Sequence, residues 1–484
     1  MTKRRPARVL LIVCGLLLLG AVQAIARSAD QHPAVSRGPA LTVGLSGAPE
    51  LTGGSSAARA QWVHSANAVG TQIVRITAYW GEIASDQPPN EADAVDPNWS
   101  GYHWASLDEQ VEALTADGFR VMITVTSAPV WAEGANMIPN APAGTWEPSA
   151  SDFGEFATAI TRRYDGSTKA RGRYLPRVTL WQPWNEPNLN LDLSPQWIPG
   201  PNGSWLAASP GLYRNLLNAF YSAAKAVSWS NYVIAAGTAP LGDPPGNYRM
   251  APVTFYQYLF CLNTDDGYVG CSNPPYFDAI DHHPYGIKGP EAQNTNAADA
   301  PLPDIYRLTR VLNVAERDHT ALPAGKKAIW VTEFAWYTNP PTPGGVPLQQ
   351  EARWVEQAFY VLWQQGVSNV LWYRIVDEPG GSSALINTNS GLYFKDGQAK
   401  PAATAFYFPF LTNRRDHTTI VAWGRAPQGG ELKIEQQAKH GWTVVTQFSV
   451  TKDEVFQLPL RLKGKATLRA VLGANDSLTW SQAA

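Results

Sequence analysis

Strand-like and helix-like segments alternate along most of the chain. Eight short segments are rich in apolar and β-branched residues, at positions 41–45, 72–77, 120–126, 177–181, 232–237, 277–282, 327–332 and 367–374. Each is followed by a segment with helical spacing of apolar residues, at 57–69, 106–116, 151–164, 211–227, 253–261, 304–318, 349–365 and 400–408. Strands that are apolar on both faces are typical of a parallel sheet covered by helices. The pattern therefore predicts an α/β fold, a (β/α)8 (TIM) barrel over residues 41–412.

The segments that follow several of these strands are long and rich in proline and glycine. They lie at 86–97, 139–148, 195–210, 240–252 and 340–347. In a barrel of this kind the connections after the strands gather at the carboxyl-terminal face, where active sites are found. We therefore expect the substrate-binding residues on these loops.

The hydrophobic pattern changes after residue 412. Apolar and polar residues alternate at 418–423, 431–437, 442–447, 455–462, 466–472 and 477–480, with glycine-containing turns between several of these segments. Such alternation is typical of antiparallel strands with one buried face. It predicts a small β-sandwich domain over residues 413–484. Glycan binding and capping of the barrel both remain open as its role, and we favour a structural, accessory one.

The first 26 residues have the pattern of an export signal. Four basic residues precede an apolar run at 9–22, and Ala24-Ile25-Ala26 supplies small residues for cleavage. The run is short for a membrane span. We expect a signal peptide at 1–26, a linker at 27–40, a secreted mature protein and no stable membrane span after cleavage. An uncleaved membrane anchor is the alternative.

Composition and charge narrow the possible functions. Hydrophobic residues make up 44% of the 484 residues and charged residues 16%, which suits a large folded core and excludes a disordered chain. The formal net charge is only −2, so we expect no nucleic-acid partner. No Gly-x-Ser-x-Gly, Walker A or strand-linked Gly-x-Gly-x-x-Gly motif indicates esterase or nucleotide-dependent chemistry. We expect a monomer.

Cysteine is rare in this chain. Cys14 lies within the apolar run, which leaves Cys261 and Cys271 in the mature protein. In an oxidising compartment two cysteines ten positions apart are expected to bridge one loop. Two free buried thiols are the alternative.

Two glutamates carry the candidate chemistry. Glu186 follows the fourth predicted strand, and Glu333 follows the seventh. A separation of three strand–helix units in a closed barrel of eight places them across the mouth from each other, on the same face. Two facing carboxyl groups can cleave a glycosidic bond, because one protonates the leaving oxygen while the other attacks the anomeric carbon or activates water.

Several motifs near the strand ends fit this interpretation and resemble a known group of enzymes. They are Trp184-Asn185-Glu186-Pro187, Thr332-Glu333-Phe334, His283-Pro284-Tyr285, Arg75, Pro129 with Trp131, and Trp372. In order and spacing they resemble the clan A glycoside hydrolases, retaining enzymes with a (β/α)8 barrel, and most of all family 39-like and family 5 cellulase-like members. The resemblance covers all eight strands of the barrel.

The resemblance implies roles for the two glutamates and their neighbour. Glu186 would be the general acid/base, and Glu333 the nucleophile that forms a glycosyl-enzyme intermediate. Asn185 would hydrogen-bond the 2-hydroxyl of the sugar.

The resemblance also implies roles for the residues around Glu333. Tyr285 and His283 would hold it in orientation, and Arg75 would keep it ionised, although a purely structural ion pair is an equal alternative for Arg75. Trp372 would form the floor under the cleaved sugar.

Nineteen tryptophans suit a protein that binds sugars, since a planar aromatic ring matches the apolar face of a sugar. We expect Trp131, Trp184 and Trp336 to contact substrate, although packing of the loops is an equal alternative for any one of them. The sequence thus predicts a hydrolase of β-linked oligo- or polysaccharides that needs no metal or cofactor. A non-catalytic glycan-binding protein on the same barrel is the alternative.

Overall fold

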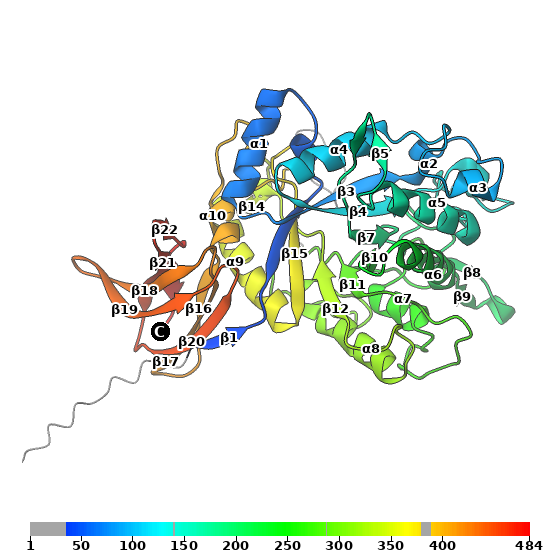
Figure 1. Cartoon of the computed structure of the whole chain (residues 1–484). Coiled ribbons are helices and arrows are strands. Elements are labelled where there is room, and N and C mark those ends of the chain that lie inside the picture. Colours follow the sequence, from blue (N-terminus) through cyan, green and yellow to red (C-terminus); the bar gives the residue numbers. More distant parts are fainter. Residues whose placement is uncertain (1–34, 139–140, 287, 379–388) are drawn as a thin grey trace, which may run out of the picture.

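A computed structural model describes residues 35–138, 141–286, 288–378 and 389–484. The predicted signal peptide lies outside these residues. The central element is a closed parallel barrel, so the predicted fold is confirmed (Figure 1). Its strands, in order around the barrel, are β2 (Thr42–Ser46), β3 (Ile73–Tyr79), β4 (Arg120–Thr126), β7 (Leu180–Pro183), β10 (Tyr232–Thr238), β11 (Ala279–His282), β12 (Ala328–Val331) and β15 (Val367–Tyr373).

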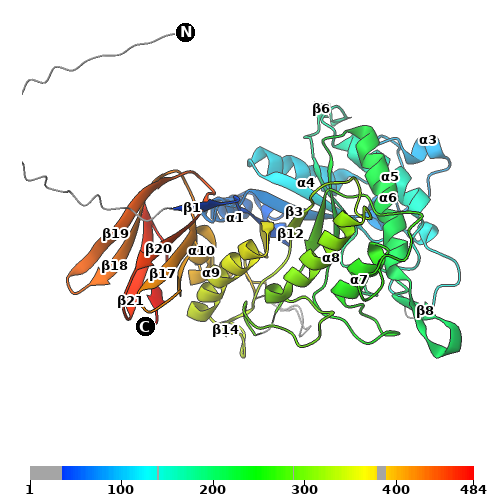
Figure 2. The ribbon, with the colours of Figure 1, turned by 90° about the horizontal axis from the view of Figure 1, so that it is seen from below.

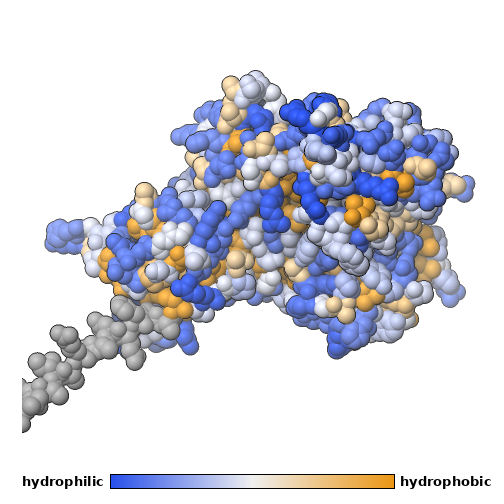
Figure 3. All heavy atoms as spheres, viewed as in Figure 1, coloured by the Kyte–Doolittle hydropathy of each residue, from blue (hydrophilic) through white to orange (hydrophobic). Residues whose placement is uncertain are grey.

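Helices surround the barrel and follow the strands in the predicted order. They are α1 (Ser56–Ala68), α4 (Ala105–Ala116), α5 (Ala150–Arg163), α6 (Ser209–Val227), α7 (Pro252–Leu259), α8 (Tyr306–Arg317), α9 (Leu348–Gln364) and α10 (Pro401–Tyr407). Each turns an apolar side to the strands, as expected for a covered parallel sheet. On the face seen in Figure 3, hydrophilic residues predominate and apolar residues form small scattered patches. Among the described residues no helix is long and apolar enough to cross a membrane.

The loops contain short elements that the periodicity does not reveal. They are α2 (Trp80–Ile83), α3 (Glu91–Ala94), the hairpins β5 (Lys169–Ala170) with β6 (Arg173–Tyr174) and β8 (Trp197–Pro199) with β9 (Trp205–Ala207), and the parallel pair β13 (Thr338–Asn339) with β14 (Val346–Pro347). The fourth barrel strand also begins later than position 177, because Val178 N–H still donates to the Tyr164 carbonyl at the end of α5.

An apolar cluster fills the lower interior of the barrel. Seven strands each contribute one side chain to it: Ile73, Met122, Leu180, Ile234, Ala279, Trp330 and Leu371. The eighth strand, β2, contributes Gly44, where a Cβ would lie 2.3 Å from the Ile73 carbonyl oxygen. Glycine is required there because the backbone approaches its neighbour too closely for any side chain. The interior is therefore packed below the level at which the glutamates stand.

The C-terminal domain consists of two antiparallel sheets, as a sandwich requires. One sheet contains β16 (Phe410–Arg414), β17 (Thr419–Arg425), β20 (Val455–Arg461) and β1 (Ser36–Gly38). The other contains β18 (Gly430–Ala438), β19 (Gly441–Val450), β21 (Ala466–Leu472), β22 (Asn475–Asp476) and β23 (Trp480–Gln482). The predicted linker at 27–40 thus includes a strand, because β1 pairs with β20 before the chain enters the barrel (Figure 2).

Aromatic side chains join this domain to helix α9 of the barrel. Trp423 of β17 is fully buried, with its ring centroid 5.5 Å from that of Tyr360 and 6.0 Å from that of Trp363. The guanidinium group of Arg353 lies 4.0 Å from the centroid of Trp480. The domain is therefore packed against the barrel as part of one structure, which supports a structural role.

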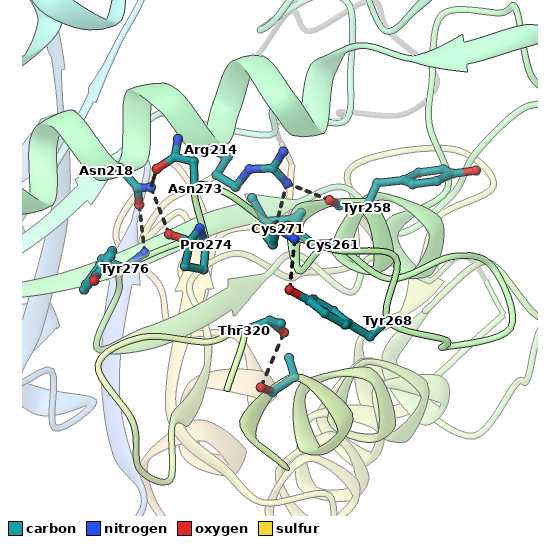
Figure 4. The surroundings of a disulfide bond; sticks show 12 residues. Arg214, Asn218, Tyr258, Cys261, Tyr268, Cys271, Asn273, Pro274, Tyr276 and Thr320 are labelled. Carbon is teal, nitrogen blue, oxygen red and sulfur yellow. Dashed lines mark hydrogen bonds between the residues drawn. A yellow bond between two sulfur atoms is a disulfide. The ribbon is translucent and has the colours of Figure 1, made fainter. Parts of the chain in front are cut away.

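Cys261 and Cys271 form a disulfide, as predicted (Figure 4). It closes the loop between α7 and β11, where the Cys271 N–H donates to the Tyr268 hydroxyl at 2.9 Å. A short covalent loop of this kind restricts the unfolded chain and so stabilises the fold.

Trp423→Ala tests whether the domain contributes to the stability of the barrel. We expect the free energy of unfolding to fall by about 3–5 kcal/mol, because a large buried ring is removed from the contact. Val444→Ala, an exposed position on the outer strand β19, is the control and should change it by no more than about 0.5 kcal/mol. Chemical denaturation measures both. Equal effects of the two substitutions would show that the contact with α9 adds nothing.

Candidate active site

Glu186 and Glu333 stand at one end of the barrel, beside a cavity of about 1040 Å³. Glu186 lies three residues after β7, and Glu333 two residues after β12. Both carboxylates line the cavity, with 18% and 15% of their side chains exposed. The fold therefore brings the two groups to the same opening, although they are distant in sequence.

The backbone that presents Glu186 adopts an unusual conformation. Trp184 has φ 74° and Glu186 has φ 35°, in the left-handed region that residues with side chains rarely occupy. Contacts on both sides hold this turn: the Trp184 N–H donates to Val125 O of β4, and its indole N–H donates to Asp192 O, both at 2.7 Å. Strain of this kind persists only where surrounding structure imposes it, and it is typical of functional sites.

Arg75 of β3 contacts both segments that carry the glutamates, through Glu333 itself and through Asn185, the neighbour of Glu186. Its buried guanidinium group forms an ion pair with Glu333 Oε1 and donates to Asn185 Oδ1 at 2.7 Å. Its Nε donates to Thr124 Oγ1 and Gln182 Oε1 at 2.7 and 2.8 Å. Arg75 is thus both the ionic partner of Glu333 and a structural ion pair of the barrel interior, the two roles that the sequence left open.

Glu333 accepts hydrogen bonds at both of its oxygens. Arg75 donates to Oε1, and the Tyr285 hydroxyl donates to Oε2 at 3.1 Å. Burial and the negative charge of Glu333 raise the pKa of Tyr285 well above its usual value, so Tyr285 remains a donor at neutral pH. Glu333 is thus held at both oxygens, by a cation and by a hydroxyl donor.

His283 contacts the other glutamate. Its Nδ1 lies 2.9 Å from Glu186 Oε1 but 4.0 Å from Glu333 Oε2, so the expectation that it orients Glu333 is wrong: it holds Glu186. Its Nε2 lies 3.1 Å from Thr332 Oγ1. The Thr332 hydroxyl already donates its only hydrogen to Asp281, so it can only accept from His283. Nε2 must therefore carry a hydrogen, which leaves Nδ1 to share a proton with Glu186.

Negative groups surround this histidine. Burial by itself lowers the pKa of His283, but the charges of Glu333 and Asp281 and the hydrogen bonds to Asp281 and Glu186 raise it to about 10. His283 therefore keeps the proton that it shares with Glu186 at neutral pH, and its charge offsets part of the negative charge around it.

A layer of polar side chains connects these contacts across the barrel. Gln182 Nε2 donates to Asp281 Oδ2 at 2.6 Å, and Asp281 Oδ1 accepts from Thr332 N–H at 3.0 Å. Gly237, with φ +61°, leaves room for the layer: a Cβ there would lie 2.6 Å from Gln182 Nε2 and 2.9 Å from Asp281 Oδ2. Gln182 and Asp281 are fully buried, so the network is closed off from solvent.

The family comparison agrees with this geometry. Residues 38–374 match the model of the cellulases of glycosyl hydrolase family 5. The chain belongs to this family. It is therefore a glycoside hydrolase, and the expected clan A relationship is confirmed. No curated protein sequence matches the chain.

Solved structures support the fold of this hydrolase. A family 39 glycoside hydrolase from Bacteroides cellulosilyticus WH2 is similar at 16% identity and a TM-score of 0.51, over 87% of this chain and 81% of that one. A glucosidase from Croceicoccus marinus is similar at 14% identity and a TM-score of 0.51, over 89% of this chain and 97% of that one. At such identities the likeness establishes the fold, not a substrate.

The tryptophans of the hydrolase lie mostly outside the cavity. Trp184 and Trp372 are fully buried, contrary to the expectation that they contact sugar. Strand alternation accounts for Trp372: Leu371 points into the barrel, so Trp372 points outward, where its ring packs on Phe406 of α10. Trp131 donates to the Ala84 carbonyl and does not line the cavity.

Other aromatic side chains line the cavity of the hydrolase. They are Trp336, Tyr79, Tyr285, Tyr337 and Tyr373. Tyr79 and Tyr373 are the last residues of β3 and β15, so counting the strand period to its end would have identified them.

The sequence analysis did not predict the side chains of the polar layer. Thr124, Gln182 and Asp281 each interrupt an apolar strand, and a polar residue within a strand buried on both faces is the signal that could have revealed them. Across the described residues, no three His, Cys, Asp or Glu side chains are placed to hold a metal ion.

Gly237→Ala tests whether the polar layer sets the activity of the hydrolase. The new Cβ would push apart Gln182 and Asp281, so we expect a loss of kcat as well as stability. Gly118→Ala is a matched control, since Gly118 also has positive φ, 86°, but a Cβ there meets nothing within 4 Å. The control should lose about 1–2 kcal/mol of stability and keep its kcat. If both variants retain wild-type kcat, the layer has no part in catalysis.

Proposed function

We propose that this glycoside hydrolase is a secreted retaining enzyme that cleaves β-linked oligo- or polysaccharides by double displacement. The observation that carries the proposal is the unequal environment of the two glutamates. Glu333 faces a guanidinium cation and a hydroxyl donor, whereas Glu186 faces an imidazole with which it shares a proton. The first environment suits a nucleophile and the second a general acid/base.

The spacing of the carboxyl groups supports retention. Because His283 Nδ1 lies 2.9 Å from Glu186 Oε1 and 4.0 Å from Glu333 Oε2, those oxygens are at most about 7 Å apart. Retaining glycosidases hold their carboxyl groups about 5–5.5 Å apart, and inverting ones about 6.5–9.5 Å apart to admit a water. A separation of at most about 7 Å between these two oxygens is compatible with retention.

The first step transfers the sugar to the enzyme. Glu186 gives its proton to the glycosidic oxygen while Glu333 attacks the anomeric carbon, so the C–O bond to the leaving group breaks as the ester bond to Glu333 forms. Asn185, held by Arg75, hydrogen-bonds the 2-hydroxyl in the transition state. In the second step Glu186 takes a proton from water, the oxygen of which attacks the same carbon and releases Glu333.

The cavity supports a substrate longer than one sugar. Its lining includes Pro49 and Thr52 on one side of the barrel mouth and Leu241 and Arg249 on another, with the two glutamates between. A site that receives residues from several sides of the mouth suits a chain that extends on both sides of the cleaved bond.

Export is proposed from the signal-like first 26 residues and is supported by the Cys261–Cys271 disulfide, since disulfides persist in oxidising compartments. Mass spectrometry of the mature protein should find Arg27 as its first residue. A mature chain that retains residues 1–26 would contradict the proposal.

Trapping with 2-deoxy-2-fluoro β-glycosides of glucose, xylose, mannose and galactose tests the proposed chemistry. We expect one of them, carrying a good leaving group such as fluoride or dinitrophenolate, to inactivate the enzyme and to label Glu333. The fluorine slows both steps, and the good leaving group restores formation of the glycosyl-enzyme but not its release. Peptide mapping of the labelled protein identifies both the residue and the accepted sugar. Label on any other residue would overturn the assignment.

Two variants complete this test. Glu333→Gln should abolish turnover and labelling. Glu186→Ala should slow glycosides with poor leaving groups far more than a dinitrophenyl glycoside, which needs no acid to depart. A Glu333→Gln enzyme with intact turnover would remove the basis of the proposal.

A further inference from the structure

The chain after Glu186 turns back toward the site. The Leu189 N–H donates to the Glu186 carbonyl and the Leu193 N–H to the Leu189 carbonyl, both at 2.9 Å. The indole of Trp184 fixes the end of the turn by donating to the backbone carbonyl of Asp192. Asp192 is thereby brought beside Asn185, seven residues earlier in the sequence, on the wall of the cavity.

The amide of Asn185 is held from both ends. Its Oδ1 accepts from Arg75 Nη2 at 2.7 Å, and its Nδ2 donates to Asp192 Oδ1 at 3.0 Å. Arginine can only donate, so the oxygen of the amide must face Arg75 and the nitrogen must face Asp192. Without Asp192, the nitrogen end would have no partner among the described residues.

Asp192 itself has one oxygen engaged and one open. Oδ1 accepts from Asn185, whereas Oδ2 receives no hydrogen bond from the described residues, and the half-buried side chain lines the cavity. Burial, with the nearby charges of Glu186 and Glu333, raises the pKa of Asp192 to about 8, against the opposing effects of Asn185 and His283. A third carboxyl group thus stands in the site without adding a full negative charge at neutral pH.

We propose that Asp192 is a positioning residue that fixes the Asn185 amide in the orientation required by the 2-hydroxyl of the sugar. The inference rests on the proposed function, because it needs a sugar beside Asn185. Of the hydrogens on Asn185 Nδ2, one is committed to Asp192, and the other is directed by that bond. Loss of Asp192 would let the amide rotate about its side-chain torsions, and a misplaced contact of this kind costs up to about 100-fold in rate.

Kinetics on a 4-nitrophenyl β-glycoside and on its 2-deoxy analogue test the proposal. The sugar is the one that labels the enzyme as its 2-fluoro derivative. For Asp192→Ala we expect kcat/KM on the glycoside to fall about 10–100-fold, with a much smaller fall on the 2-deoxy analogue, which has no hydroxyl for Asn185 to bind. Asp192→Asn should keep most of the activity, because its side-chain oxygen can still accept from Asn185.

Non-additivity gives an independent check. If Asp192 acts through Asn185, the double variant of Asn185→Ala with Asp192→Ala should be no slower than Asn185→Ala alone. The proposal is overturned if Asp192→Ala has wild-type kinetics, loses equal activity on both substrates, or adds fully to Asn185→Ala. An inactive Glu333→Gln enzyme beside a normal Asp192→Ala enzyme would overturn only this inference, whereas an active Glu333→Gln enzyme would overturn the proposed function.

Thermal unfolding at several pH values tests the placement of Asp192 without any substrate. The folded protein binds a proton at Asp192 up to about pH 8, whereas an unfolded chain releases it near the ordinary pKa of about 4. The free energy of unfolding of the wild type should therefore fall as the pH rises between those two pKa values. The Tm of Asp192→Asn relative to wild type should rise from pH 5 to pH 9. A constant difference would contradict the placement of Asp192 beside Glu186 and Glu333.

Discussion

The buried ion pair between Arg75 and Glu333 is the constraint on which the site depends. Both side chains are largely removed from water, and an isolated charge in such a place is costly. Removing one partner of a buried ion pair destabilises a protein by about 3–5 kcal/mol. The side chains around the pair must therefore keep both partners in place. Ser46, Thr124, Gln182 and Asn185 accept further hydrogen bonds from Arg75, and through them the ends of β2, β3, β4 and β7 are fixed relative to Glu333.

The same network gives different surroundings to two chemically identical side chains. Arg75 and Tyr285 donate to Glu333, whereas His283, itself held by Thr332 and Asp281, shares a proton with Glu186. Two other parts of the fold stabilise the barrel away from the site. The apolar cluster fills the barrel below the polar layer, and the C-terminal domain packs on α9, outside the barrel. The two glutamates thus differ because the closed barrel gives them different hydrogen-bond partners.

The barrel could be predicted from the sequence because its strands and helices have different hydrophobic periods. The two glutamates could be predicted because each follows a strand. The tryptophans could not: Trp372 and Trp184 are buried by strand alternation and by a turn with positive φ, neither of which composition reveals. The partner of His283 depends on side-chain directions in three dimensions, and β1 pairs with a strand more than 400 residues away, so local patterns contain no sign of either.

The stereochemistry of hydrolysis tests the central claim most directly. With Glu333 as the nucleophile, the sugar passes through a covalent bond to the enzyme, so its anomeric configuration is inverted twice. Proton NMR during the first minutes of hydrolysis of a β-glycoside should show the β-anomer as the first product, with the α-anomer appearing only by mutarotation. If the α-anomer forms first, a water molecule performs the displacement, and Glu333 is not the nucleophile.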